Sequence, residues 1–219
     1  TNSVESYLKA NKKKKLWTNI KRGKKKLEET YLIDYEYNYG SISDEKCAFI
    51  LDTLKEMISK RFGMEALRHS FIMDWENNIL DMADSIRQEK TSLLVIYSDH
   101  KPVSISVNRH VAGTIFFCDT HGFDLNYSEY GLGNINNYMR LNLCFKNKIP
   151  FLDLGNGVSD FKKIWCNSFY ETYYLIYFKK HDFIATVIAY FEITKIRLKN
   201  FIKSCVYNIH HKKILNKKF

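Results

Sequence analysis

The hydrophobic positions of the chain follow two periods. Apolar side chains recur every three or four positions over residues 43–63, which predicts a helix with one buried face. They alternate with polar ones over residues 31–39, which is typical of a half-buried strand. Residues 92–99, 101–110 and 112–120 are rich in β-branched and aromatic side chains and are separated by short turns. These three runs predict an antiparallel meander.

The second half of the chain predicts a crossover. Residues 131–147 have a largely helical pattern, and residues 150–157 form a short strand that ends in glycines. A strand, a loop, a helix and another strand in succession imply a parallel pair. We expect a short helix over 158–167, a strand over 171–180 and an apolar core helix over 182–207. One further helix is expected over 74–88, between the first strand and the meander.

The positive charge lies at the two ends of the chain. Residues 9–26 carry ten Lys or Arg and no acid, residues 193–219 carry eight and no acid, and residues 27–192 hold 16 basic against 23 acidic side chains. The basic helix of residues 9–26 has one thin apolar stripe, so it is either the solvated face of a packed helix or a surface for tRNA or an anionic membrane. The residues from His210 to the end could bind a metal or nucleic acid, but we expect them to form a frayed, solvated tail.

Composition favours one globular domain. The 219 residues are 45% hydrophobic, and no apolar run approaches the roughly 18 residues of a membrane span. No repeat or Ser/Pro-rich linker divides the chain, so we expect a single domain over 1–219 with helical extensions at 1–30 and 182–219. Five cysteines without a C-x-x-C pair indicate reduced thiols and a cytoplasmic protein, and the scattered histidines indicate no metal site.

The segment YSEYGLGNI places two glycines between an aromatic run and a helix. Gly131 and Gly133 allow close approach of a ligand to the backbone, where the free N–H groups of a first helical turn bind phosphate oxygens. A tight turn before a helix is the alternative. The pair is not a Walker loop, because no Gly-Lys-Ser/Thr follows, and the third glycine of a dinucleotide fingerprint would fall at Asn136.

A mixed α/β sheet whose antiparallel strands lead into a glycine loop, a helix and a parallel strand resembles the GNAT N-acyltransferase fold. The segment FLDLGNGVSDFKKIWCN is similar to the pattern fDfG-x-G...yK...w of the CelD/BcsL-like acetyltransferases, which are related to the FemABX aminoacyl transferases. The matching positions are Phe151, Asp153, Gly155, Gly157, Phe161, Lys162 and Trp165. The basic opening and the Tyr127–Ile135 loop also resemble the family, whereas Ser128 stands where the general GNAT loop has Gln or Arg.

The resemblance implies an acyl-CoA-dependent N-acyltransferase that acts on an amine of a small molecule, amino sugar or peptide. The residues it implies for acyl-CoA binding are Phe117, Cys118, Asp119, Gly131, Leu132, Gly133, Asn134, Ile135 and Asn156. Two alternatives remain: a FemABX-like transferase that uses charged tRNA, and a catalytically silent GNAT-like module that binds nucleic acid, a membrane or a protein through its basic ends.

Four side chains are candidates for the chemistry. Asp153 could accept a proton from the amine or hold the glycine loop, and Lys162 could pair with Asp153 or bind a phosphate. His121 could be a base near neutral pH or an exposed loop residue, and Tyr127 could protonate the departing thiolate or pack in the core. Cys118 is expected to be a small buried hydrophobe rather than a nucleophile.

Overall fold

The computed structural model describes residues 3–11, 13–63, 70–157, 159–179 and 181–215. The chain divides into two compact units, Thr1–Ser168 and Phe169–Phe219. The sheet and all helices but one belong to the first unit. The expectation that the C-terminal residues belong to the same domain stays a prediction.

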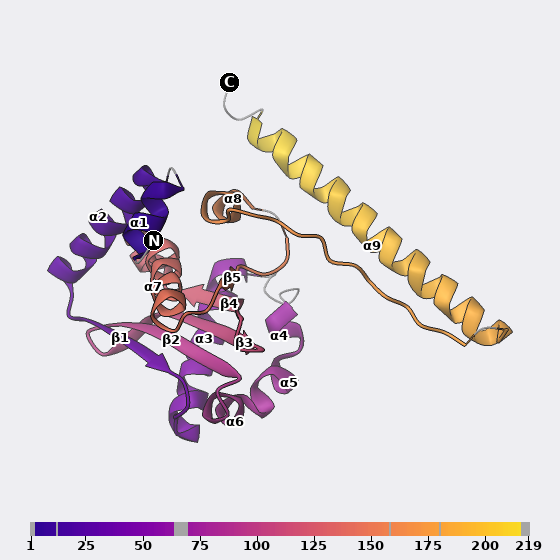
Figure 1. Cartoon of the computed structure of the whole chain (residues 1–219), viewed down its shortest axis with the longest axis horizontal. Coiled ribbons are helices and arrows are strands. Elements are labelled where there is room, and N and C mark those ends of the chain that lie inside the picture. The colour runs from indigo at the N-terminus through magenta and orange to yellow at the C-terminus, as the bar shows by residue number, and fades with distance from the viewer. Residues whose placement is uncertain (1–2, 12, 64–69, 158, 180, 216–219) are drawn as a thin grey trace. The chain divides into compact units, whose positions relative to one another are not determined.

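The first unit is built on a five-stranded mixed sheet (Figure 1). Its strands lie in the order β1-β2-β3-β4-β5, with the bounds β1 (Ile33–Asn38), β2 (Thr91–Ser98), β3 (Lys101–Val111), β4 (Ile115–Phe123) and β5 (Phe151–Asp153). Each of the first three strands is antiparallel to the next, and β5 is parallel to β4. The predicted meander, the crossover and the mixed α/β class are therefore confirmed.

Helices occur where the periodicity placed them, with two corrections: the basic helix expected over 9–26 begins only at Lys14, because a first short helix ends at Ala10, and the helix expected over 74–88 is divided. The helices are α1 (Val4–Ala10), α2 (Lys14–Thr30), α3 (Asp44–Phe62), α4 (Ser70–Met73), α5 (Trp75–Leu80), α6 (Met82–Arg87), the 3-10 helix η2 (Leu125–Tyr130), α7 (Leu132–Lys146), α8 (Asp160–Trp165) and α9 (Phe183–Leu215). The single helix expected over 74–88 is two helices. Asp81 separates them, because its φ of −113° and ψ of 19° leave the helical region.

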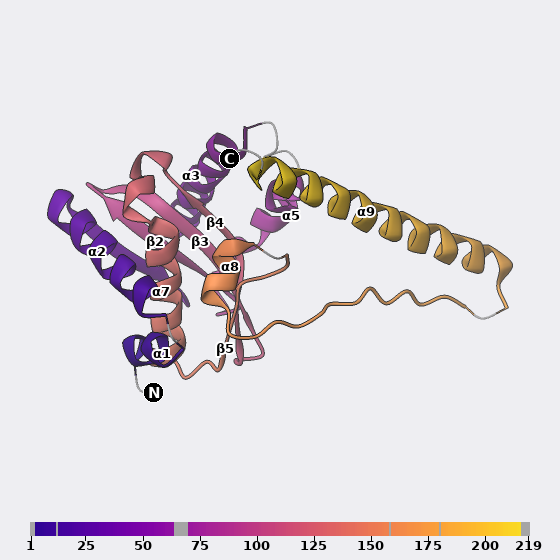
Figure 2. The same ribbon diagram turned by 90° about the horizontal axis from the view of Figure 1, so that it is seen from above.

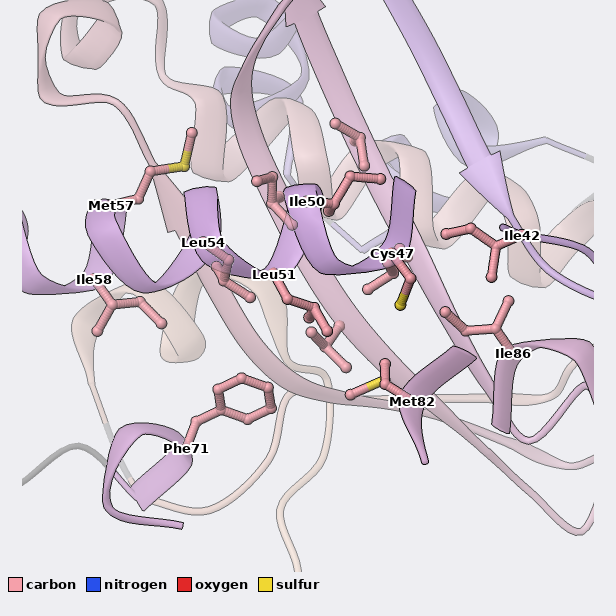
Figure 3. Packing of buried hydrophobic residues seen from close by; sticks show 14 residues of the cluster. Ile42, Cys47, Ile50, Leu51, Leu54, Met57, Ile58, Phe71, Met82 and Ile86 are labelled. Carbon is pink, nitrogen blue, oxygen red and sulfur yellow. The ribbon is translucent and has the colours of Figure 1, made fainter. Parts of the chain in front are cut away.

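Helix α3 covers one face of the sheet. Its apolar stripe, which includes Leu51 and Leu54, meets Phe71 and Met82 from the neighbouring short helices in a buried cluster (Figure 3). A Cβ on Gly122 of β4 would stand 2.8 Å from Leu54 Cδ1, so the helix packs directly on the strand at this glycine. The Ser43 hydroxyl accepts from the Lys46 N–H at 3.2 Å and caps the helix as predicted.

Helices α2 and α7 lie side by side on the opposite face (Figure 2). Leu27 of α2 is fully buried with Ile96 of the sheet and Ile135 of α7. A Cβ on Gly23 would stand 2.3 Å from the Tyr130 carbonyl oxygen, so α2 crosses η2 at backbone distance. The basic helix is therefore a packed helix whose lysines form its outer face, and binding of tRNA or an anionic surface by that face stays a prediction.

The second unit corrects two predictions. No strand forms among the described residues of 171–180, and α9 extends to Leu215, eight residues beyond the expected end at Tyr207. A strand needs a neighbour for its N–H and C=O groups, whereas a helix satisfies its own. Within the part of the chain that the structure describes, no helix is long and apolar enough to cross a membrane.

Candidate active site

The first glycine of the pair makes the turn between η2 and α7. Gly131 has a φ of 68° and a ψ of 45°, the left-handed region that glycine enters without a Cβ penalty. Its N–H donates to the Ser128 carbonyl at 3.2 Å, which ends η2, and its own carbonyl begins α7. The sequence therefore sets the position at which the N-terminus of α7 opens.

The first turn of α7 leaves two main-chain donors. The N–H groups of Asn134 and Ile135 donate to the Gly131 carbonyl at 2.9 Å and 3.2 Å. The N–H groups of Leu132 and Gly133 bond to no acceptor among the described residues, as expected for the first positions of a helix. These two donors carry the partial positive charge of the helix end.

Helix α8 packs against this helix end. The Trp165 indole N–H donates to Asn134 Oδ1 at 2.9 Å, and ring atoms of Phe161 lie 3.8 Å from the place of a Cβ on Gly133. The Lys13 ammonium donates to the carbonyls of Ile164 and Cys166 at the end of α8, at 2.5 Å and 3.0 Å. Part of the basic N-terminal segment thus fixes α8 over the glycine turn.

Strands β4 and β5 separate after three paired positions. The last pair is Phe117 with Asp153, and β4 continues to Phe123 without a strand on that side among the described residues. Gly155, with a φ of 74°, turns the chain so closely that its Cβ would lie 3.1 Å from the Cys118 carbonyl oxygen. The main chain of β4 that faces away from β3 is therefore unpaired from Asp119 onward.

The two charged residues of the family-like motif hold the second glycine loop. The Gly155 N–H donates to Asp153 Oδ1 at 2.8 Å, and the Lys162 ammonium donates to the Gly155 and Asn156 carbonyls at 2.9 Å and 2.5 Å. Burial lowers the pKa of Lys162, while the charge of Asp153 opposes that shift. Asp153 at the end of β5 and Lys162 on α8 thus hold the same loop, and Lys162 does so by binding its main-chain oxygens.

His121 lies on a strand, so the expectation of an exposed loop histidine is wrong. Strand β4 runs three residues further than predicted and carries the partly buried His121 with it. Its Nε2 is 2.9 Å from the Ser104 hydroxyl, and its Cε1 is 4.0 Å from the place of a Cβ on Gly133. Burial, and then the charges of Arg140 and Arg61, hold the pKa of His121 well below its usual value.

Tyr127 lies among packing aromatics. Its hydroxyl donates to the Ser98 hydroxyl at 3.1 Å, and its ring centroid is 5.1 Å from that of Tyr31 and 6.2 Å from that of Tyr130. It joins the cluster beneath α2. A catalytic role for Tyr127 stays a prediction.

The acidic residues near this loop each have a separate partner. Asp119 accepts from Arg109 Nε at 2.8 Å, and Glu129 forms an ion pair with Lys26. Asp124 caps η2 by accepting from the Asn126 N–H. Hence these carboxylates do not form one cluster.

Cys118 is buried, as predicted, and burial raises the pKa of its thiol. Cys47 and Cys144 are buried as well. Over the described residues, His, Cys, Asp and Glu side chains nowhere gather in the groups of three that a metal ion would need.

The sequence interpretation missed Arg140. This arginine lies on α7, and it is only 4% exposed. The sequence signal that could have found it is the run KPVSISVNRH, in which small polar side chains alternate with apolar ones, because the structure buries both faces of β3 over residues 102–108.

No family model and no curated protein matches the chain. Solved structures resemble it at low identity. A GCN5-related N-acetyltransferase from Ralstonia eutropha JMP134 has a TM-score of 0.49 and 9% identity, over 66% of this chain and 98% of that chain. A possible acetyltransferase from Clostridium difficile 630 has a TM-score of 0.46 and 14% identity, over 66% and 99%.

A conserved protein of unknown function from Bacteroides thetaiotaomicron VPI-5482 has a TM-score of 0.45 and 12% identity. This match covers 62% of the chain described here and 43% of the Bacteroides protein, so the chain spans less than half of it. Two of these three structures are thus named as acetyltransferases. Because every one of these three scores is below 0.5, they carry no conclusion about activity.

Proposed function

We propose that the protein is an acyl-CoA-dependent N-acyltransferase. The observation that carries the proposal is the pair of unpartnered N–H groups on Leu132 and Gly133, placed next to a strand that loses its partner after Phe117. An acyl-CoA offers a diphosphate to helix N–H groups and a pantetheine arm with two amides to an unpaired strand. The N-terminus of α7 and the unpaired part of β4 therefore match two parts of one ligand.

The diphosphate would bind at the first turn of α7. Leu132 and Gly133 would donate their N–H groups to its oxygens, since those of Asn134 and Ile135 already bond to the Gly131 carbonyl. The Asn134 side chain is held by Trp165 and would keep the turn in place. The aliphatic Ile135 side chain is buried in the core, so it would act by fixing α7.

The pantetheine arm would lie along β4. The Cys118 carbonyl is already covered by Gly155, so main-chain pairing with the arm would begin at Asp119. Phe117, whose ring packs 3.6 Å from the place of a Cβ on Gly155, would form one wall. Asn156 would border the arm from the loop that Lys162 holds.

The chemistry transfers an acyl group from sulfur to nitrogen. The amine attacks the thioester carbon, the N–C bond forms and the C–S bond breaks, and the proton lost by the amine must reach a base. His121 is uncharged at neutral pH because its pKa is lowered, so its imidazole can accept this proton. Asp153 would orient the amine from the end of β5, and Tyr127 could serve the thiolate only if its hydroxyl left Ser98.

Binding of acyl-CoA is tested by calorimetry with acetyl-CoA and longer acyl-CoAs, combined with hydrogen exchange of the Leu132 and Gly133 amides. We expect heat and protection of both amides. Gly133→Trp should abolish binding, because an indole there would cover the helix end, whereas Gly133→Ala should bind because its Cβ would make ordinary contacts. Leu80→Trp is the control, since Leu80 is 77% exposed. Absence of heat and of protection in the unmodified protein would refute the proposal.

The tRNA-dependent and catalytically silent alternatives predict a different result. Both depend on the basic ends, where Lys14, Lys15 and Arg22 of α2 are exposed. Exchanging these three residues for Gln should leave acyl-CoA binding unchanged if the transferase proposal holds. Loss of a strongly salt-dependent RNA affinity in that variant, with no effect of Gly133→Trp, would favour the alternatives.

A further inference from the structure

A polar layer lies buried between β3 and α7. On β3, Ile105 and Val107 face the α3 cluster, while the alternate positions Ser104, Ser106 and Asn108 face α7 and are fully buried. The facing residues of α7 are Asn136, Asn137 and Arg140, which are 0%, 1% and 4% exposed. Buried polar side chains at this density need partners or a function.

Arg140 is the charge in this layer. Its Nε donates to Asn108 Oδ1 and its Nη1 donates to Asn137 Oδ1, both at 2.8 Å. Both partners are neutral amides. The Nη2 of Arg140 and the Nδ2 of Asn137 find no hydrogen-bond partner among the described residues. Each of them is two covalent bonds from one end of the hydrogen bond between Nη1 and Oδ1, so the two donors flank the same contact.

Among the residues that the structure describes, none of the titratable groups that act on Arg140 is an anion at neutral pH. The titratable side chains that face it are Cys118, Cys144 and His121. Burial raises the pKa of the Cys118 thiol and raises that of Cys144 to about 12, so both thiols are uncharged at neutral pH. His121 is neutral there as well. A buried cation without a counter-ion is strongly disfavoured, so its presence calls for a compensating anion.

We propose that Arg140 and Asn137 form a buried site for a carboxylate group of a ligand. Two adjacent donors, one of them charged, match the two oxygens of a carboxylate. A phosphate has more oxygens and more charge than this pair satisfies. The proposal goes beyond acyl-CoA binding and can be tested without turnover.

The carboxylate has two sources that share this chemistry. The Cys118 thiol faces Arg140. The carbonyl of the same residue lies against the Gly155 loop, which borders the proposed position of the acyl-CoA arm. The carboxylate could therefore be the far end of a dicarboxylic acyl group. It could also belong to a free acid, such as the acceptor.

Two variants remove the site in different ways. Arg140→Met removes the charge at similar length, and Asn137→Asp places a carboxylate beside the guanidinium inside the protein. We expect Asn137→Asp to melt above the wild type in the absence of carboxylates, because it supplies the missing counter-ion. Arg22→Met is the control, since Arg22 is exposed on α2.

The first arm measures melting of the full chain in formate, acetate, succinate or chloride at constant ionic strength and pH. Preferential stabilisation by carboxylates in the wild type and Arg22→Met, but not in Arg140→Met or Asn137→Asp, supports a free acid. The second arm compares succinyl-CoA with butyryl-CoA by calorimetry. An affinity for succinyl-CoA at least about tenfold higher, lost in Arg140→Met, supports the acyl group as the source.

The proposal is overturned if the wild type distinguishes neither carboxylates from chloride nor the two thioesters. It is also overturned if Arg140→Met keeps the response, or if Asn137→Asp melts below the wild type. Should Arg140→Met fail to fold, the wild-type comparisons and Asn137→Asp still decide. If neither thioester binds, the transferase proposal fails, while the first arm continues to test the carboxylate site.

Discussion

The crossing of α2 over η2 allows a prediction about a single methyl group. In Gly23→Ala, the new Cβ would stand 2.3 Å from the Tyr130 carbonyl oxygen, whereas an ordinary contact is 3.4–4 Å. The two backbones must therefore separate by about 1 Å, or the chain must distort locally. Neither atom belongs to a flexible side-chain end, so the strain cannot relax by a rotamer change.

The size of the effect follows from two opposing terms. Overpacking of a close contact costs about 1–3 kcal/mol, and replacing Gly by Ala inside a helix returns about 1 kcal/mol. Because the overlap is with main-chain atoms, the packing term lies at the upper end of its range, at about 2–3 kcal/mol, and we expect a net loss of about 1–2 kcal/mol. For a chain of 219 residues this corresponds to a melting temperature lower by about 2–8 °C.

Asn19→Ala is the matched control, since Asn19 is exposed on the same helix. Calorimetric or dichroism melting should show Gly23→Ala destabilised and Asn19→Ala unchanged or slightly stabilised. Because Tyr130 directly precedes Gly131, separation of α2 from η2 should also weaken acyl-CoA binding. A Gly23→Ala protein as stable as the wild type would refute the backbone contact.

Three further predictions test the sheet and the site. Gly122→Ala should cost about 1–3 kcal/mol in denaturant unfolding, because its Cβ would meet Leu54, and the loss should be smaller when measured in a Leu54→Ala background; simple additivity would contradict this. The pKa of His121 is lower in the folded protein than in the unfolded chain, so below a pH of about 6.5 the unfolded chain binds the proton first and the stability of the fold decreases as pH falls. His121→Asn should therefore unfold with a shallower acid dependence than the wild type. Lys162→Met removes two hydrogen bonds to the Gly155 loop and should weaken acyl-CoA binding about tenfold in calorimetry with a small change in melting temperature; unaltered affinity would exclude its loop from the site.

Part of the candidate site could be predicted from sequence because it depends on local backbone geometry. Gly131 turns into the left-handed region and starts α7 where the glycine pair indicated. Lys162 holds the Gly155 loop seven residues away, which is one of the roles that the sequence allowed for it, whereas the contact of Trp165 with Asn134 was not predicted. Such short-range features follow from residue type, since few residues adopt a positive φ.

Other predictions failed where a partner decides the outcome. The alternation over 171–180 indicated a strand, yet a strand exists only when another strand pairs with it. The hydrogen bonds of α9 are internal, so this helix forms without a pairing partner and continues past its expected end to Leu215. His121 lies on β4 and not on the expected loop, because pairing with β3, and not the residues of the strand itself, decides where β4 ends.

The sequence by itself determined the five strands of the sheet, the helices α3 and α7, the crossover and the glycine turn, because hydrophobic period and glycine conformation are properties of neighbouring residues. Only the tertiary structure decided that the polar side of β3 is covered by α7. That packing joins Asn108 to Arg140 across 32 positions and leaves a buried cation facing neutral amides. No local pattern encodes such a meeting, since burial is fixed by the segment that packs on top and not by the strand itself.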